Sequence, residues 1–250
     1  MPILPLSDKN PLQYIRNGFC TWALIALCIF IFLYQLGLTN YVKYHFVHTF
    51  GIVPGALFGN IQAISSLPPW MTLFSHMFLH GGLMHLAGNM LLLWVLGDNI
   101  EDALGHGRYI LFYGTCGVIA ALTHSIADTS SSTPMIGASG AISGIIGAYL
   151  LLHPKAPIKT LIWFFIIELP TWAVLGVWVL FQLFSAIMAT GGNDGGVAWW
   201  AHIGGLFAGM ALIIPMRRNG VELFDRGVRI ESIISGPRIT MRSGPWSRRQ

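Results

Sequence analysis

The sequence predicts an all-α fold, a polytopic membrane protein in which six transmembrane helices form one bundle. Only 10% of the 250 residues are charged and 54% are hydrophobic, whereas about 25% of the residues of an ordinary soluble domain are charged. Long uncharged stretches recur along the chain, and its 29 glycines suit closely packed membrane helices better than a soluble core. These observations exclude a soluble enzyme.

Six stretches are long and apolar enough to cross a bilayer, because a charged side chain at the bilayer centre is expensive. In chain order we expect spans at Cys20–Leu38, Leu79–Ile100, Tyr109–Ile126, Ile136–Leu152, Thr171–Ala189 and Val197–Met216. The three cysteines, Cys20, Cys28 and Cys116, all fall inside apolar stretches. We therefore expect neither a disulfide framework nor a CxxC metal site.

The segment before the fifth span needs its own interpretation. Residues Ile158–Ile167 are apolar but too short to cross, and Glu168 and Pro170 separate them from the span. We expect this segment to dip into the membrane and return. Six crossings then place thirteen of the fourteen lysines and arginines on one side and leave only Lys43 on the other. This asymmetry indicates that both termini are cytoplasmic.

Three regions follow from these spans: a cytoplasmic N-tail (1–19), a six-span domain (20–216) and a basic cytoplasmic C-tail (217–250). The C-tail contains eight arginines and three acidic residues, which indicates a solvated orientation signal rather than a nucleic-acid partner, since no fold accompanies it. We expect no cleavable signal peptide, because the first apolar stretch is a full span without an evident cleavage site. The apolar segment Tyr41–Met71 is expected to lie in the membrane interface.

Polar residues cluster in spans two, four and six, which all begin on the outer face. These residues are His85, Asn89, Ser139 and His202. A serine, two histidines and an asparagine at matched depth suggest a nucleophile, a base and donors for an oxyanion. We expect acyl transfer, with Ser139 as nucleophile and His202 as its base. His85 and Asn89, four residues apart on one helical face, and the Ser139 backbone N–H would hold the oxyanion.

A catalytic triad would need an acid beside His202, and the sequence favours a dyad instead. The acids of span two and Glu168 lie toward the inner side, and Asp128 and Asp194 lie in outer loops among flexible residues. Close approach of spans four and six is expected at their small residues, namely Gly140, Gly144, Gly147, Gly205 and Gly209.

Three motifs together carry a resemblance to a known family. His85-Leu-Ala-Gly-Asn89, Gly137-Ala-Ser139-Gly140 and Ala201-His202-Ile-Gly-Gly205 occur in this order on alternate spans. In this combination the chain resembles the rhomboid intramembrane serine proteases over about residues 45–215, which would make the fold a six-transmembrane-helix rhomboid-like bundle. The segment Glu101-Asp-Ala-Leu-Gly105 after span two is also similar to a family feature.

The resemblance implies an intramembrane serine endopeptidase that cuts transmembrane proteins near the outer membrane face. It implies a catalytic dyad of Ser139 and His202, with His85 and Asn89 holding the oxyanion. It further implies that the loop Gly191–Gly196 caps the site. Span five, with Trp172 and Trp178, is a candidate lateral gate for substrate, and its aromatic residues equally suit interface anchors. Two departures are present. Ser143 stands where many members have an aromatic residue against the histidine, and Trp70-Met71 stands where many have Trp-Arg.

Other interpretations remain open at this point. His76, His80 and His85 are spaced like helical metal ligands, but the run lacks HExxH and any carboxylate, so we expect no metal and no cofactor. A catalytically silent client-binding protein of the same architecture and a transporter are the alternative functions. The expected partners are transmembrane protein substrates and the lipid bilayer. The short tails suit a bacterial plasma (inner) membrane, and the sequence leaves the oligomeric state open.

Overall fold

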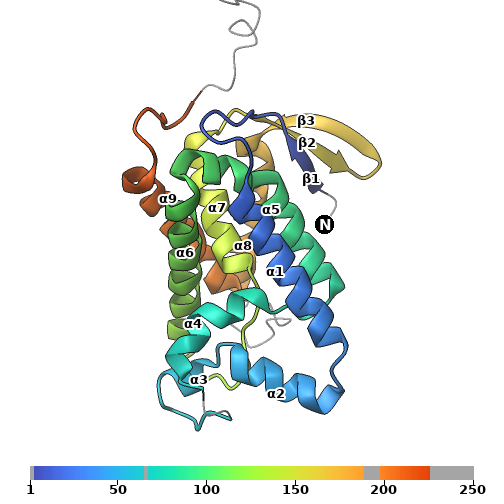
Figure 1. Cartoon of the computed structure of the whole chain (residues 1–250), viewed down its shortest axis with the longest axis vertical. Helices are drawn as coiled ribbons and strands as arrows, with labels where there is room; N and C mark the ends of the chain where they lie inside the picture. Colours follow the sequence, from blue (N-terminus) through green and yellow to red (C-terminus); the bar gives the residue numbers. More distant parts are fainter. Residues whose placement is uncertain (1–2, 65–66, 189–197, 226–250) are drawn as a thin grey trace, which may run out of the picture.

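The computed structural model describes residues 3–64, 67–188 and 198–225. The chain is mostly helical, and its elements pack into one elongated body (Figure 1). In chain order the elements are β1 (Ile3–Asp8), α1 (Phe19–Leu36), α2 (Asn40–Phe50), α3 (Pro54–Leu57), η1 (Pro69–Met71), α4 (Thr72–Ser75), η2 (His76–Phe78), α5 (Leu83–Leu104), α6 (His106–Ala127), α7 (Ser139–Leu152), β2 (Pro157–Ile162), β3 (Phe165–Pro170), α8 (Thr171–Met188) and α9 (Trp199–Met216).

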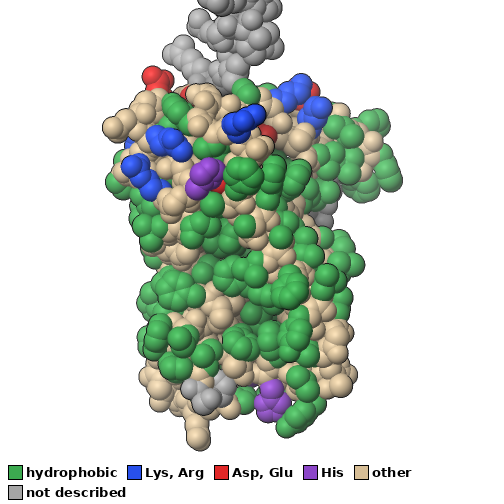
Figure 2. Space-filling view, viewed as in Figure 1, with side chains coloured by type: hydrophobic (Ala, Val, Ile, Leu, Met, Phe, Trp, Pro, Cys, Tyr) green, Lys and Arg blue, Asp and Glu red, His purple; other side chains and the backbone are tan. Residues whose placement is uncertain are grey.

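Four of these helices, α1, α5, α6 and α9, are long and apolar enough to cross a membrane. The helix α7 and residues Thr171–Ser185 of α8 are shorter apolar helices. Large hydrophobic side chains are exposed along the outside of the bundle, for example Phe30 of α1, Leu111 of α6 and Leu180 of α8. Figure 2 shows this apolar surface below an end where Lys and Arg side chains gather. The protein is therefore an integral, multi-pass membrane protein.

The helix α7 lies at the centre of the bundle and packs against α5, α6, α8 and α9. Its side chains Ile142, Ile145, Ile146 and Tyr149 are fully buried. A helix that is hydrophobic on all sides belongs in a protein interior. The helix α7 has 14 residues and is therefore only about 21 Å long. Because other helices cover it, α7 need not match the thickness of the bilayer.

The glycines that the sequence singled out lie where α7 crosses α9. A Cβ atom added to Gly209 would collide with the backbone of Gly144, and one added to Gly205 would collide with the Gly140 carbonyl oxygen. Only glycine permits such a close approach of two helix backbones. The expected meeting of spans four and six is thus confirmed.

A three-stranded antiparallel sheet in the order β1-β2-β3 corrects the expectation of an all-α fold and shows the form of the segment before α8. The fold is not purely helical, because the N-tail contributes β1. The segment Ile158–Ile167, which the sequence predicts to dip into the membrane and return, forms most of a β-hairpin. The physical reason is alternation: Ile158 and Thr160 are buried while Lys159 is exposed, and a period of two residues fits a half-buried strand.

The N-terminal segment is attached to the rest of the protein by two acids at the end of α5. The Asp102 carboxylate accepts hydrogen bonds from the backbone N–H groups of Gln13, Tyr14 and Ile15 at 2.7–2.8 Å. Glu101 accepts from the first N–H groups of α1, those of Cys20 and Thr21, at 2.9 and 2.8 Å. Unpaired N–H groups at a helix start favour such a carboxylate.

Short helices between α1 and α5 form a layer at the end of the bundle opposite the sheet (Figure 1). This layer contains the segment Tyr41–Met71, which the sequence places in the interface. Ile52 in this segment forms an antiparallel bridge with Met135, just before α7. Three sequence expectations lie outside the described residues: the capping loop Gly191–Gly196, the acid Asp194, and the C-tail beyond Asp225.

Candidate active site

Ser139 is the first residue of α7, at the end of the bundle opposite the sheet. The first backbone hydrogen bond of this helix runs from the Ile142 N–H to the Ala138 carbonyl at 3.0 Å. The N–H groups of Ser139, Gly140 and Ala141 therefore precede the helical ladder. Negative charge that develops beside Ser139 would meet free donors and the positive end of the helix dipole.

His202 on α9 contacts Ser139 directly. Its Nε2 atom lies 2.8 Å from the Ser139 Oγ atom, although the two residues are 63 positions apart in the chain. The imidazole is almost fully buried. The nucleophile and base predicted from the sequence are thus within hydrogen-bond distance of one another.

The other ring nitrogen of His202 is held by a residue that the sequence analysis missed. The His202 Nδ1 atom lies 2.8 Å from the Oε1 atom of Gln182, a buried residue of α8. An amide oxygen only accepts hydrogen bonds, so Nδ1 carries the proton and Nε2 is free to accept one from the Ser139 hydroxyl. Gln182 therefore fixes the tautomer that a general base requires.

A signal for Gln182 was present in the sequence. It is the only amide or charged side chain between Thr171 and Ala189. A polar side chain inside an apolar span is a candidate functional residue by default. Only the tertiary structure identifies His202 as its partner, because α8 and α9 are separate elements.

Two tryptophans also flank the His202 ring. Ring centroids lie 6.0 Å apart for Trp178 of α8 and 6.2 Å apart for Trp199 of α9. Ser143, which stands where many family members have an aromatic residue, is buried and donates its hydroxyl proton to the Ser139 carbonyl oxygen at 2.7 Å. The imidazole is therefore packed by aromatic rings that come from α8 and α9 instead of α7.

His85 and Asn89 lie one turn apart on α5 and flank the backbone just before Ser139. Gly137 has φ of +126°, and a Cβ atom placed there would lie 2.8 Å from His85 Nε2 and 3.8 Å from Asn89 Nδ2. Glycine is needed here both for this φ and for the space. All four predicted site residues thus lie around one point at the start of α7.

Both of these α5 side chains have a donor group available. The Gly81 N–H points to His85 Nδ1 at 3.5 Å, which leaves Nε2 as the ring atom that carries the proton. The Nδ2 group of Asn89 is buried and has no hydrogen-bond partner in the part of the chain that the structure describes. An unpaired buried donor costs about 1–3 kcal/mol, so its retention favours a function.

Within the described residues, none of the acids considered for a triad is a hydrogen-bond partner of His202. Glu101 and Asp102 hold the N-terminal segment, and Glu168 pairs with Lys9 at 2.5 Å. Within residues 3–64, 67–188 and 198–225, His76, His80 and His85 do not form a metal-ligand group. The group that the described residues do offer is Cys20, Glu101 and His106, and its Glu101 already accepts hydrogen bonds from α1.

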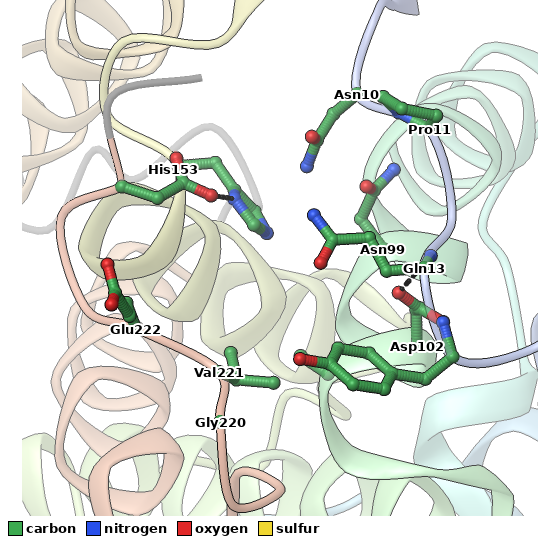
Figure 3. Close-up of a pocket in the computed structure, with 12 residues that line it drawn as sticks. Asn10, Pro11, Gln13, Asn99, Asp102, His153, Gly220, Val221 and Glu222 are labelled. Carbon is green, nitrogen blue, oxygen red and sulfur yellow. Dashed lines mark hydrogen bonds and ion pairs between the residues drawn. The ribbon is translucent and has the colours of Figure 1, made fainter. Parts of the chain in front are cut away.

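A polar cavity of about 190 Å³ lies at the opposite end of the bundle (Figure 3). It is lined by Asn99, Asp102, Glu222 and His153, whose Nδ1 atom lies 2.6 Å from the Asp225 carboxylate. His153 directly follows α7, whereas Ser139 begins it. The length of α7 therefore separates this cavity from Ser139, and the cavity is distinct from the candidate active site.

Comparison with known proteins shows the family to which the chain belongs. The sequence profile of the Rhomboid domain matches residues 68–219, so the chain belongs to the rhomboid family. Among curated proteins, the chain is 35% identical over 150 residues to rhomboid protease GluP of Bacillus subtilis (strain 168), which covers 58% of this chain and 27% of that protein. It is 34% identical over 143 residues to rhomboid protease GlpG of Salmonella newport (strain SL254), which covers 56% of this chain and 46% of that protein. The matched part is thus less than half the length of these relatives.

Proposed function

We propose that this protein is an intramembrane serine endopeptidase that cuts transmembrane proteins near the outer face of the bilayer. The single observation that carries the proposal is the 2.8 Å contact between Ser139 Oγ and His202 Nε2 inside an apolar bundle. A serine next to a correctly oriented histidine is an activated nucleophile. Membership of a family that includes rhomboid proteases supports the same activity.

The reaction proceeds through an acyl-enzyme. The Ser139 oxygen attacks the carbonyl carbon of the substrate while His202 Nε2 takes the hydroxyl proton. Asn89 Nδ2, His85 Nε2 and the Ser139 backbone N–H donate to the oxyanion that forms. The intermediate then collapses, the C–N bond breaks, and the leaving amine takes the proton from His202. A water molecule, deprotonated by His202, then attacks the acyl carbon. The bond from that carbon to Ser139 Oγ breaks, His202 returns the proton to Oγ, and the acid product leaves.

The same proposal includes six crossings with both termini in the cytoplasm. The helices α7 and α8 add to the four longer spans, and burial of α7 explains how a short helix takes part. Lys and Arg side chains gather at the end that carries the sheet (Figure 2), as expected for the cytoplasmic side. The candidate site then lies toward the outer face, and a bacterial inner membrane is the proposed location.

The substrate is a transmembrane helix that unwinds locally near the cut. A peptide bond inside a helix is not accessible to a nucleophile, so glycine, proline and small residues are favoured near it. Ser139, which would attack that bond, is the first residue of α7 and is partly exposed.

The test is cleavage of a panel of tagged single-span proteins in detergent, with cut sites mapped by mass spectrometry. We expect the wild-type chain to cleave and to be labelled by a fluorophosphonate at Ser139, and Ser139→Ala to do neither while it remains folded. Ser130→Ala, which changes an exposed serine of an outer loop, is the matched control. Undiminished turnover by Ser139→Ala would overturn the proposal. Substrate capture without any cleavage or labelling would instead favour a client-binding protein.

A further inference from the structure

The β2–β3 hairpin ends in an exposed apolar segment, Trp163–Ile167, which we call the hairpin tip. All five of its side chains are exposed, with relative accessibilities of 73% for Trp163, 90% for Phe164 and 74% for Phe165. The catalytic proposal gives this segment no role. Large aromatic groups exposed together mark an interaction surface or an aggregation hazard.

The apolar residues cover both faces of the hairpin tip. Successive side chains of a strand point to opposite faces, so Phe165, Ile166 and Ile167 present apolar groups on each side of β3. A strand that rests on a protein partner keeps one face polar toward water. The exposure on both faces instead fits an apolar medium that surrounds the tip.

The turn itself retains aromatic residues at a conformational cost. Ile162 pairs with Phe165, so Trp163 and Phe164 form a two-residue turn, and Trp163 has φ of +57°. Turns of this kind favour asparagine and glycine, because a side chain in the left-handed region is strained. Trp163 occupies that position nonetheless, which indicates that its indole serves a purpose outside the fold.

Charge is confined to the other end of the hairpin. Lys159 and Glu168 are opposite one another in the register, and Glu168 pairs with Lys9, which directly follows β1. In Figure 2 an apolar lobe projects from the bundle beside the layer of Lys and Arg side chains, where Figure 1 places this hairpin. Basic groups near lipid phosphates and aromatic rings just below them are the pattern of a membrane interface.

We propose that the hairpin tip inserts into the headgroup–acyl boundary of the leaflet at the sheet end of the bundle. The lipid-exposed surface of α8 continues directly into this hairpin, because Thr171 follows β3 without a loop. The depth of insertion is limited because β3 is an edge strand of the described sheet. Its outward backbone groups are unpaired in that sheet, and such groups are costly in the hydrocarbon core of a bilayer. Insertion anchors the start of α8, the helix that carries Gln182.

The test places an environment-sensitive NBD fluorophore on single cysteines of the full chain in nanodiscs, each holding one copy. Cys20→Ser provides the parent chain, because Cys28 and Cys116 are buried. The probe is attached at Phe165→Cys and, as a matched control, at the exposed hairpin base through Lys159→Cys. We expect lipids with a shallow nitroxide to lower the emission of the probe at position 165 about twofold or more. We expect aqueous iodide to quench the probe at position 159 more strongly than the probe at position 165.

A second variant separates insertion from folding. The pair Trp163→Asn and Phe164→Gly introduces a favoured two-residue turn, so the hairpin persists while its aromatic tip is lost. We expect this chain, with the probe at position 165, to keep its thermal stability and to lose most of the nitroxide quenching. Equal iodide access at positions 159 and 165 in the parent chain would overturn the proposal. So would protection at position 165 that occurs only when several copies associate in detergent.

Discussion

The orientation of His202 depends on residues from three helices. Ser139 of α7 contacts Nε2, Gln182 of α8 contacts Nδ1, and tryptophan rings from α8 and α9 flank the imidazole. The sequence identified Ser139 and His202 because polar groups in apolar spans are conspicuous. It gave no means of pairing Gln182 with His202, because that contact depends on how α8 packs against α9.

Replacement of Gln182 tests this positioning role. Gln182→Leu leaves the His202 Nδ1–H buried without an acceptor, at a cost of about 1–3 kcal/mol, so we expect kcat to fall roughly tenfold to a hundredfold with little change in KM. Gln182→Glu keeps an acceptor oxygen and is expected to restore much of the rate. Steady-state cleavage of a model substrate measures both variants. Equal rates for Gln182→Leu and wild type would show that another group holds His202.

Asn89 tests the proposed oxyanion site. We expect Asn89→Ala to lower kcat by about a hundredfold or more, as loss of one oxyanion donor does elsewhere. We also expect unchanged or higher thermal stability, because the Nδ2 group is already buried without a partner among the described residues. Asn99→Ala is the matched control on the same helix, since Asn99 donates to Asp8 at the opposite end. Loss of stability without loss of rate at Asn89 would contradict this assignment.

At the level of elements, the helix α7 begins at the proposed nucleophile, Ser139. The sequence predicted a span from Ile136, whereas the helix starts at Ser139, preceded by extended backbone that pairs Met135 with Ile52. Non-helical backbone at membrane depth is tolerated only where protein covers it. The residues from Ile136 to Ala138 therefore lie outside the helix, which hydropathy alone could not reveal.

The α7–α9 crossing gives a prediction for stability and activity together. Gly209→Ala places a methyl group against the Gly144 backbone, and we expect destabilisation of about 1–3 kcal/mol from overpacking. The helices also move apart, so fluorophosphonate labelling of Ser139 should fall. Gly114→Ala on α6 is the control, because among the described residues no atom beyond the neighbouring backbone of α6 lies within 4 Å of the added Cβ. Thermal unfolding in detergent measures the difference, and equal stability of the two variants would refute the packing argument.

At the level of the whole molecule, the sheet end joins both ends of the described chain to the bundle. Asp8 of β1 accepts hydrogen bonds from Tyr149 of α7 at 2.6 Å and from Asn99 of α5 at 2.7 Å. Burial raises the pKa of the Asp8 carboxyl to about 6, with Asp98 adding to the rise and His153 opposing it. The docked strand therefore favours the protonated carboxyl.

Attachment of β1 should consequently depend on pH. The pKa of Asp8 is higher in the docked state than its ordinary value of 3.8. The contribution of Asp8 to the docking of β1 is therefore greatest at low pH and is lost as pH rises through about 6. We expect β1 docking to weaken by about 1–3 kcal/mol between pH 4 and pH 8. Hydrogen-exchange protection factors of the β1 amides measure it. Asp8→Asn should remove the pH dependence, and protection that rises with pH would contradict the prediction.

The sequence by itself determined that the protein is a polytopic, mostly helical membrane protein, and it selected His85, Asn89, Ser139 and His202. It could do so because charge is excluded from apolar spans, so each polar residue that remains there is conspicuous. The tertiary structure decided which residues and segments meet. Gln182 contacts His202, Gly137 lies beside His85, and β1 pairs with the β2–β3 hairpin. These contacts depend on how distant segments of the chain pack together. Complementary shape and hydrogen bonding between such segments produce no periodic pattern in the sequence.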